Sequence, residues 1–534
     1  MMKSTPGSRE SIHVAGSVFF VSSAGRVLKL PIPSSCHRDP LTWRPSKRFF
    51  AFFALQFYSV VSALGVNLPG LLTTAFGVEF GHNDTGPFSI ESLSSAMTLF
   101  TGLGYIVGIP LSLAVGRRPV ILGASVVTSA ATLWAGNAGD FYQLLIALSI
   151  QALACGVSVG LSVLIIIDAT FIHERPNALS LMWCLVSAVI RLSMIILPFS
   201  ADLNHYWRCV YVVWVGPCVV AFVLLWAFVP ETFFMRPPIA LDGRILVQGG
   251  SEKVQVYEDW EEKDGSDCVR PPPDLPPKSA FWSRFKIARA PGSSYKAMWA
   301  TYVQMFLCIL NPLTFWVSLL TGVILSGVIF LNLVQPTLLA EQHGGTHSIE
   351  SVSVLLGAAG IVGSVLAFPA TGPFASWFIR YSSLRNSGVR HAEVYLPIFA
   401  IPVVSGLVSV ILNGLAIHNN WPPYWLYITS AISIFSYLTG SVAFTLWITE
   451  AFPRWAAAAL AVQLFTGNMT SFGIGTAVLR WCKTREIIPP TAIISGLILC
   501  LGVLAVPAAF YGKNVRQYIQ GRWSDSQRGA LRPQ

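Results

Sequence analysis

The sequence predicts an all-α membrane protein with twelve transmembrane helices arranged in two six-helix bundles. Of its 534 residues, 53% are hydrophobic and only 11% are charged, whereas soluble domains carry about 25% charged residues. The hydrophobic residues form twelve long apolar segments. A polar stretch, residues 230–302, divides these segments into six and six.

Each apolar segment is about 20 residues or longer, which is the length a helix needs to cross a ~30 Å hydrocarbon core. The first six form a predicted amino-terminal bundle (residues 49–229) and the last six a carboxy-terminal bundle (residues 303–512). The expected spans are 49–76, 92–113, 118–137, 142–168, 178–201, 208–229, 303–336, 351–378, 394–417, 423–448, 456–479 and 489–512. The seventh is too long for one straight helix. We expect Asn311-Pro312 to separate a lead-in helix from the span, because proline disrupts a helix interior.

Lysine and arginine residues predict the orientation. With the amino terminus in the cytosol, 30 of the 35 Lys and Arg residues fall on the cytosolic side, as the positive-inside rule requires. The tails, residues 1–48 and 513–534, and the 230–302 linker are therefore expected in the cytosol, and the plasma membrane is the expected location. The linker is acidic and proline-rich, which is typical of a flexible connector. Because the basic residues gather on one side of the membrane, the net charge of +10 does not indicate nucleic-acid binding.

Few other sequence motifs indicate chemistry. Asn83-Asp84-Thr85, in the first outer loop, is an N-glycosylation acceptor, although the shortness of this loop leaves the unmodified alternative open. The nine cysteines include no Cys-x-x-Cys pair, so we expect neither a metal site nor a disulfide framework. No glycine loop with the phosphate-binding pattern is present, and we expect no cofactor and no ATP-driven transport.

Arg191 lies in the middle of the fifth predicted span, Ala178 to Ala201. A charge at that depth costs on the order of 3 kcal/mol, so it needs a partner, water or a ligand. One interpretation is an anchor for a substrate carboxylate or phosphate, because the arginine fork matches these groups. The alternative is a hydrogen-bond hub to carbonyls near Pro198 or to a neighbouring helix. Five further polar residues within spans are candidate substrate contacts, although packing or an interhelical hydrogen bond is the preferred interpretation of each one taken singly: Asn67, Asn332, Gln335, Gln463 and Asn468.

A second group of residues gathers at the predicted cytosolic ends of the spans. Gly116 permits a tight turn after the second span. Arg117 and Arg118 follow it and can reach Asp168, at the end of the fourth span, and acids at the neighbouring exits. We expect these ion pairs to latch the two halves and to break when the protein opens inward. The alternative is that the arginines only set the topology and contact lipid phosphates. The full set of candidate gating residues is Gly116, Arg117, Arg118, Asp168, Glu174, Arg175 and Glu231.

Short motifs at the span ends occur in an order that resembles the major facilitator superfamily, and most of all its fungal twelve-span branch grouped with drug:proton antiporters. They are Asp39-Pro40-Leu41-Thr42-Trp43, Gly116-Arg117-Arg118-Pro119-Val120, Asp168 with His173-Glu174-Arg175, Trp207-Arg208, Pro230-Glu231-Thr232, Asp242-Gly243-Arg244 and Tyr257-Glu258-Asp259-Trp260. This resemblance covers nearly the whole chain. The chain departs from the family at Leu113 and Ser376, where the usual pattern has aspartates. It also departs in the fifth span, which lacks the glycine–proline–glycine-rich motif of the antiporters.

The resemblance implies a secondary transporter, not an enzyme, that moves a small organic molecule such as a metabolite, toxin or drug by alternating access. We expect a monomer in the lipid bilayer and prefer export to uptake. Protons are the candidate coupling ion, although no acidic residue lies at a span centre. The alternatives are a nutrient importer or facilitator of the same fold, and a membrane sensor that transports nothing.

Overall fold

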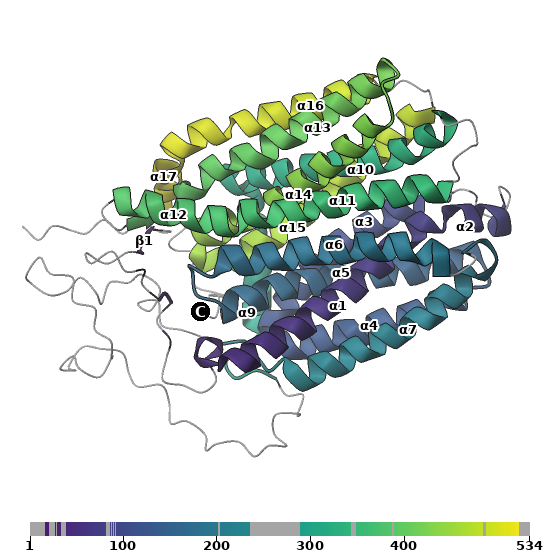
Figure 1. The fold of residues 1–534 in the computed structure, drawn as a ribbon. Coiled ribbons are helices and arrows are strands. Elements are labelled where there is room, and N and C mark those ends of the chain that lie inside the picture. Colours follow the sequence, from purple (N-terminus) through teal and green to yellow (C-terminus); the bar gives the residue numbers. More distant parts are fainter. Residues whose placement is uncertain are drawn as a thin grey trace, which may run out of the picture.

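Long helices that run side by side dominate the computed structural model of the chain (Figure 1). It describes residues 17–20, 27, 29–31, 33, 39–81, 86, 88, 90, 92–200, 203–234, 289–342, 349–386, 389–483 and 488–522. Asn83, most of the 230–302 linker and most of both predicted tails lie outside these residues.

The amino-terminal bundle begins with a short 3-10 helix, η1. Asp39 caps η1, because its carboxylate accepts the backbone N–H of Leu41 at 3.0 Å. Gly116 alone separates the third helix from the fourth. The elements are η1 (Pro40–Thr42), α1 (Pro45–Leu71), α2 (Thr73–Phe80), α3 (Ser92–Val115), α4 (Arg117–Gly136), α5 (Phe141–Ala169), α6 (Arg175–Ser200) and α7 (Leu203–Phe228).

The carboxy-terminal bundle has a similar succession of long helices with short helices between them. The break predicted at Asn311-Pro312 is confirmed: Asn311 caps a new helix by accepting the backbone N–H of Leu313 at 3.0 Å. The elements are α9 (Tyr295–Leu310), α10 (Pro312–Gln342), α11 (Ile349–Thr371), α12 (Pro373–Arg385), η4 (Ala392–Phe399), α13 (Ala400–His418), α14 (Tyr424–Ala451), η5 (Pro453–Trp455), α15 (Ala456–Lys483), α16 (Ile488–Val503) and α17 (Ala505–Arg522).

The predicted twelve-helix membrane fold is confirmed. Among the described residues, ten helical stretches are long and apolar enough to cross a membrane, and the pair α16 and α17, bent by 41°, makes an eleventh. Helix α15 is the twelfth. Its 28 residues include Gln463, Thr466 and Asn468, which make it less apolar than the others, and it packs against α10 and α3.

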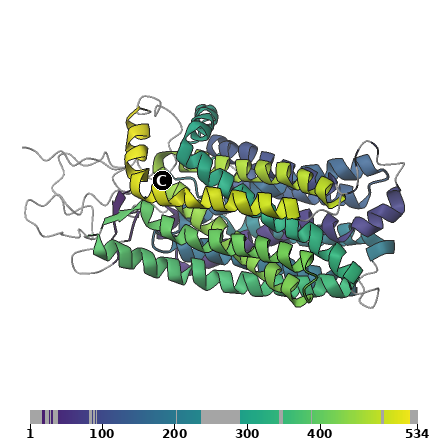
Figure 2. The same ribbon diagram turned by 90° about the horizontal axis from the view of Figure 1, so that it is seen from above.

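Two pairs of helices make the most extensive contacts between the bundles. Helix α6 packs against α11, and α3 packs against α15. We call these contacts the α6–α11 seam and the α3–α15 seam. Helix α9 packs on both α3 and α15, so it covers one part of the second seam. Figure 2, turned by 90°, shows α9 and α17 projecting from the same side of the helix stack.

A small sheet connects distant parts of the chain. Strand β1 (Ser17–Phe19) pairs antiparallel with β2 (Val389–His391), with Ser17 opposite His391. Strand β1 precedes the amino-terminal bundle, whereas β2 lies within the carboxy-terminal bundle, so this pairing ties the start of the chain to the second bundle.

Candidate functional site

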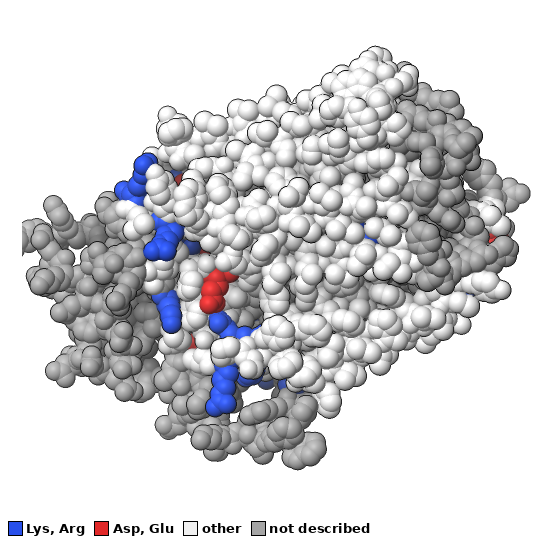
Figure 3. Space-filling view, viewed as in Figure 1, with Lys and Arg blue, Asp and Glu red and all other residues white. Residues whose placement is uncertain are grey.

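Charged side chains gather at one end of the helix stack. Figure 3 shows Lys, Arg, Asp and Glu at that end, whereas the rest of the visible face is almost free of charge. We call it the arginine-rich end, since Arg117, Arg175 and Arg390 lie there. The uncharged band beside it matches a surface that faces lipid hydrocarbon, where charged groups are costly.

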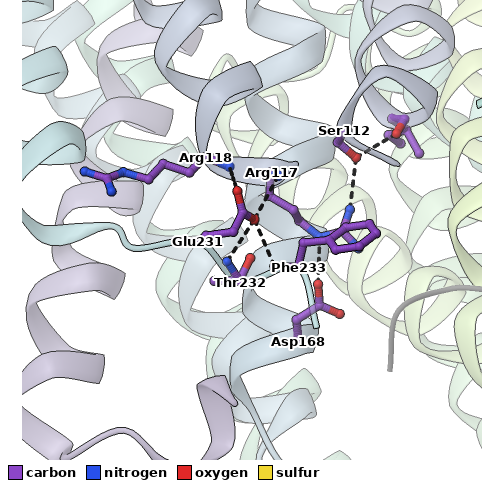
Figure 4. Close-up of polar contacts among 8 residues, drawn as sticks. Ser112, Arg117, Arg118, Asp168, Glu231, Thr232 and Phe233 are labelled. Atoms are coloured by element: carbon purple, nitrogen blue, oxygen red, sulfur yellow. Dashed lines mark hydrogen bonds and ion pairs between the residues drawn. The ribbon is translucent and has the colours of Figure 1, made fainter. Parts of the chain in front are cut away.

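The Gly116 turn is held by one carboxylate, that of Glu231 (Figure 4). Gly116 has a φ of +117°, and a Cβ at this position would lie 2.6 Å from a Glu231 oxygen. The same carboxylate accepts the backbone N–H groups of Arg117 at 2.9 Å and Arg118 at 3.1 Å. It also accepts those of Thr232 and Phe233 at 3.0 and 2.9 Å. Because Arg117 and Arg118 begin α4, Glu231 caps this helix. Its negative charge also interacts favourably with the positive amino-terminal end of the helix dipole.

Arg117 and Asp168 form a buried ion pair. The Arg117 Nε lies 2.7 Å from Asp168 Oδ2, and the two side chains are 0% and 3% exposed. Arg117 Nη1 also donates to the Ser112 hydroxyl at 3.0 Å. Arg118 instead donates to the Trp226 carbonyl at 2.8 Å. These contacts join α3, α4, α5 and α7 into one rigid group at this end.

All of the residues in this network belong to the amino-terminal bundle or to the residues directly after its last helix, α7. Glu174 does too, and it accepts from Arg48 at 3.3 Å. The Arg117–Asp168 contact that the sequence suggested does form, but within one bundle and not between the two halves. The contact between the halves involves Arg175, the remaining member of the predicted gating set.

Arg175 faces Glu450, which belongs to α14 of the other bundle. Arg175 Nη1 lies 3.9 Å from Glu450 Oε1, and both side chains are 7% exposed. Arg390 also forms an ion pair with Glu450, and the Tyr395 hydroxyl donates to it at 3.1 Å. One buried carboxylate therefore contacts a cation from each bundle.

The sequence-based set of gating residues did not include Glu450. A usable signal exists, because Glu450-Ala451-Phe452-Pro453-Arg454 ends the tenth span much as His173-Glu174-Arg175-Pro176 follows the fourth. The fourth and tenth spans occupy equivalent places in the two halves. An acid, an arginine and a proline recur at both exits.

The segment before α1 lies against both bundles at this end. The Leu30 carbonyl accepts the backbone N–H of Ile172, between α5 and α6, at 2.7 Å. The ring of Phe20 lies 5.1 Å from the Arg390 guanidinium. Phe20 and Leu30 are both buried in the core cluster that contains residues of the two bundles. The described residues of this segment, 17–20, 27 and 29–31, therefore contact both halves at their junction.

Arg191 lies far from this network, in the middle of α6. It contacts Gly360 of α11, since a Cβ built on Gly360 would lie 3.2 to 3.4 Å from the Arg191 Cδ, Cγ and Nε atoms. One turn away, the hydroxyls of Ser187 and Ser364 lie 2.9 Å apart across the same seam. Among the described residues, no hydrogen bond or ion pair involves the Arg191 guanidinium.

The other predicted substrate contacts are scattered. Gln335 donates to three acceptors, Asn413, Leu426 and Thr429, at 2.9 to 3.0 Å within the carboxy-terminal bundle. The exposed Asn67 bonds to the carbonyl of Ala63 in its own helix.

Three further candidates lie along α10 and α15. Asn332 is exposed on α10. Gln463 is buried beside Thr321, 3.4 Å away, and its Oε1 has no hydrogen-bond partner. Asn468 lies at the α3–α15 seam, because a Cβ built on Gly102 of α3 would lie 3.1 Å from the Asn468 Cβ. Of the six predicted substrate residues, Arg191 and Asn468 thus lie at seams between the bundles.

A separate ion pair ties the opposite end of the amino-terminal bundle. The Glu79 carboxylate accepts from the Trp207 indole at 2.6 Å and from Arg208 Nη1 at 2.8 Å. The hydrogen bond from Arg208 lowers the pKa of Glu79 below its usual value. The sequence singled out Trp207-Arg208 as a motif but not Glu79, its partner.

Comparison with known proteins identifies the family. Residues 49–478 match the family model of the Major Facilitator Superfamily. A transporter of this type from Schizosaccharomyces pombe (strain 972 / ATCC 24843), itself described as uncharacterized, is 20% identical over 464 residues, which is 78% of this chain and 76% of the relative.

Solved structures share the fold. The proton:xylose symporter XylE bound to 6-bromo-6-deoxy-D-glucose aligns with a TM-score of 0.60 and 14% identity over 90% of this chain and 100% of XylE. A point mutant of a peptide transporter, POT, in complex with alafosfalin aligns with a TM-score of 0.54 and 14% identity over 90% of this chain and 98% of its own. Because the family model spans most of the sequence and the helices take up this fold, the chain belongs to the major facilitator superfamily.

Proposed function

We propose that this secondary transporter uses the arginine-rich end as its gate, and that it exports small organic molecules such as metabolites, toxins or drugs. The cross-bundle contact of Arg175 with Glu450 carries the proposal. It is a buried ion pair between two bodies that must separate whenever this end opens.

The two groups of charges have different roles in this proposal. The contacts of Arg117, Asp168 and Glu231 stay within one bundle, so they keep the α3–α4 turn rigid while the bundle rocks. The contacts of Glu450 with Arg175 and Arg390 cross or adjoin the junction. Opening exposes these charges to water, which offsets part of the lost attraction. The gate can therefore open without a large net cost.

The orientation and the coupling ion belong to the same proposal. The arginine-rich end faces the cytosol, because Lys and Arg are retained on that side, and the plasma membrane is the proposed location of the monomer. In the part of the chain that the structure describes, no Asp or Glu lies at the centre of a span. Proton coupling would consequently act through buried acids at the gate, such as Glu450 and Asp168.

The test compares intracellular and extracellular metabolites, without preselection, in native cells that have or lack the protein. Export predicts that a compound class accumulates inside the cells that lack it and that the wild-type gene reverses this. A compound that stays in the medium instead would reveal an importer or facilitator. No change in any compound would contradict transport of endogenous metabolites and favour the sensor alternative.

A further inference from the structure

Arg191 is a charge at the middle of the membrane-spanning stack. It lies 16 residues after the start of α6 at Arg175, which places it about 24 Å along a helix that rises 1.5 Å per residue. The other described arginines with ion pairs lie near the ends of the stack, near the start of α1, in α4, at the start of α6, at the start of α7, in β2 and in α17. Burying a charge at this depth is costly, and ionisable residues retained there commonly mark substrate pathways.

The side chain of Arg191 lies on a glycine of the opposite bundle. The stem atoms Cγ, Cδ and Nε are the nearest neighbours of the Gly360 position. Any larger residue at position 360 would displace this stem, because even a Cβ built on Gly360 would lie only 3.2 to 3.4 Å from the Arg191 atoms. The arginine therefore occupies the α6–α11 seam, whose two sides belong to bundles that move relative to each other in this family's fold.

The guanidinium of Arg191 differs from the other cations at the junction. Arg117, Arg175 and Arg390 each form an ion pair with a carboxylate, whereas no described residue bonds to Arg191. The proposed alternative role as a hydrogen-bond hub lacks such bonds among the described residues. An arginine retained in this position without a protein partner has five N–H donors ready for a ligand.

Two neighbouring features fit an organic ligand. Across the same seam, Ser187 and Ser364 form a polar pair one turn away. Two turns away, the half-buried Trp183 has a buried indole N–H with no hydrogen-bond partner among the described residues. Its ring faces Tyr437 of the other bundle edge-on, with 6.3 Å between the ring centroids. Aromatic side chains and a few convergent polar groups are the usual lining of small-molecule sites.

We infer that Arg191 binds the carboxylate or phosphate of an organic anion that passes between the bundles, and that this residue selects anionic over neutral substrates. The inference rests on the proposed transport function and adds the class of substrate to it. The planar fork of arginine forms two parallel hydrogen bonds to such groups. A lysine at 191 would keep the charge but lose this paired geometry.

Binding to the purified full-length protein tests the inference. The probes are benzoate and phenyl phosphate, with neutral benzamide as their control, at constant ionic strength, and the readout is the midpoint of thermal unfolding. Both anions should raise the midpoint of the wild type, whereas benzamide should not. Loss of a charge-assisted hydrogen bond predicts that Arg191→Gln weakens anion binding about tenfold or more. Arg191→Lys should retain part of the binding. Unequal shifts with the two anions would tell a carboxylate site from a phosphate site.

The matched control is Arg385→Gln. In the wild type, the Arg385 guanidinium lies over the Tyr381 ring at the arginine-rich end, 4.6 Å from the ring centroid. Arg385→Gln should bind the anions like the wild type. The stability of Arg191→Gln without ligand gives a second measurement. Removal of an unpaired charge should leave the unfolding midpoint unchanged or raise it, whereas removal of a structural hub would lower it. A lowered midpoint, an equal effect of benzamide, failure of both anions to bind, or undiminished binding to Arg191→Gln would overturn the inference.

Transport separates this inference from the function on which it rests. If cells with the wild-type protein move no compound, the proposed function fails. If they move a neutral compound, or if Arg191→Gln moves an anion at the wild-type rate, then transport stands and only the role of Arg191 fails.

Discussion

The Arg175 guanidinium of the amino-terminal bundle lies 3.9 Å from the Glu450 carboxylate of the carboxy-terminal bundle. Arg390 pairs with the same carboxylate, so two buried cations share one buried anion. Neutralising the anion would remove the carboxylate that both cations share at the junction. The closed arrangement of this end therefore depends strongly on Glu450.

We predict that Glu450→Gln opens the arginine-rich end. Removing one partner of a buried ion pair typically costs about 3–5 kcal/mol, and here the cost falls only on the closed arrangement. A cysteine pair at 180 and 371 reports closure, because the Ser180 and Thr371 hydroxyls lie 2.7 Å apart across the α6–α11 seam. Oxidative cross-linking of this pair should fall in Glu450→Gln. Cross-linking at the unchanged rate would show that Glu450 does not hold the gate.

The Gly116 turn should not tolerate a side chain. The φ of +117° is found almost only in glycine, and such strain costs about 1–3 kcal/mol in other residues. Gly116→Ala would also push against Glu231, which caps α4. We expect a lower midpoint of thermal unfolding. Gly123→Ala is the control, because a Cβ there meets nothing within 4 Å, and it should be neutral or stabilising.

The buried pair of Arg117 and Asp168 should show strong coupling in a double-mutant cycle. Arg117→Met removes the cation that pairs with the buried Asp168 carboxylate, and a loss of about 3–5 kcal/mol is expected. The double variant Arg117→Met/Asp168→Leu removes both charges, so it should recover much of that loss. Denaturant unfolding of the four proteins measures the coupling. Simple addition of the two single effects would mean that the pair contributes little.

At the opposite end of the bundle, Glu79 should make the stability of the folded protein depend on pH in the acidic range. Arg208 lowers the pKa of Glu79 in the folded protein, so the stabilising effect is complete above the unfolded pKa of about 4.3. It is lost as the pH falls through the lower, folded pKa. Glu79→Gln should unfold at a lower temperature than the wild type at neutral pH, and this difference should shrink below about pH 4.3. Arg208→Gln should behave alike, whereas a constant difference at every pH would contradict the assignment.

Removal of residues 1–33 should loosen the junction of the bundles. The truncation eliminates β1, the Phe20 contact with Arg390 and the hydrogen bond from Ile172 to Leu30. Amide hydrogen exchange at residues 389–391 and at Ile172 should become faster, since these amides lose partners. Removal of residues 1–10 leaves β1 intact and serves as the control. Unchanged exchange after the longer truncation would contradict this role.

Hydropathy alone predicted the helical membrane fold, because a chain in lipid must satisfy its backbone within each helix. The breaks were predictable for local reasons. Pro312 starts a helix after the Asn311 cap, and Gly116 supplies a backbone conformation that other residues avoid. Asp168 was also predictable as a partner of Arg117, since both residues lie at the same ends of neighbouring spans.

Contacts between distant segments could not be predicted in this way. The pairing of Arg175 with Glu450 depends on how the two bundles dock, and no local pattern encodes that docking. Gln335 illustrates the opposite problem. It was a reasonable substrate contact by composition, yet its amide is occupied by three acceptors that come from other helices of its own bundle.

The pairing of β1 with β2 has a consequence for the order of folding. Residues 17–19 leave the ribosome before either bundle, but their partners at 389–391 follow about 370 residues later. At roughly 5–20 residues per second, synthesis of the intervening chain takes on the order of a minute. Strand β1 is thus made before both bundles but is among the last elements to reach its final place, because the bundles must be inserted before it can bridge them.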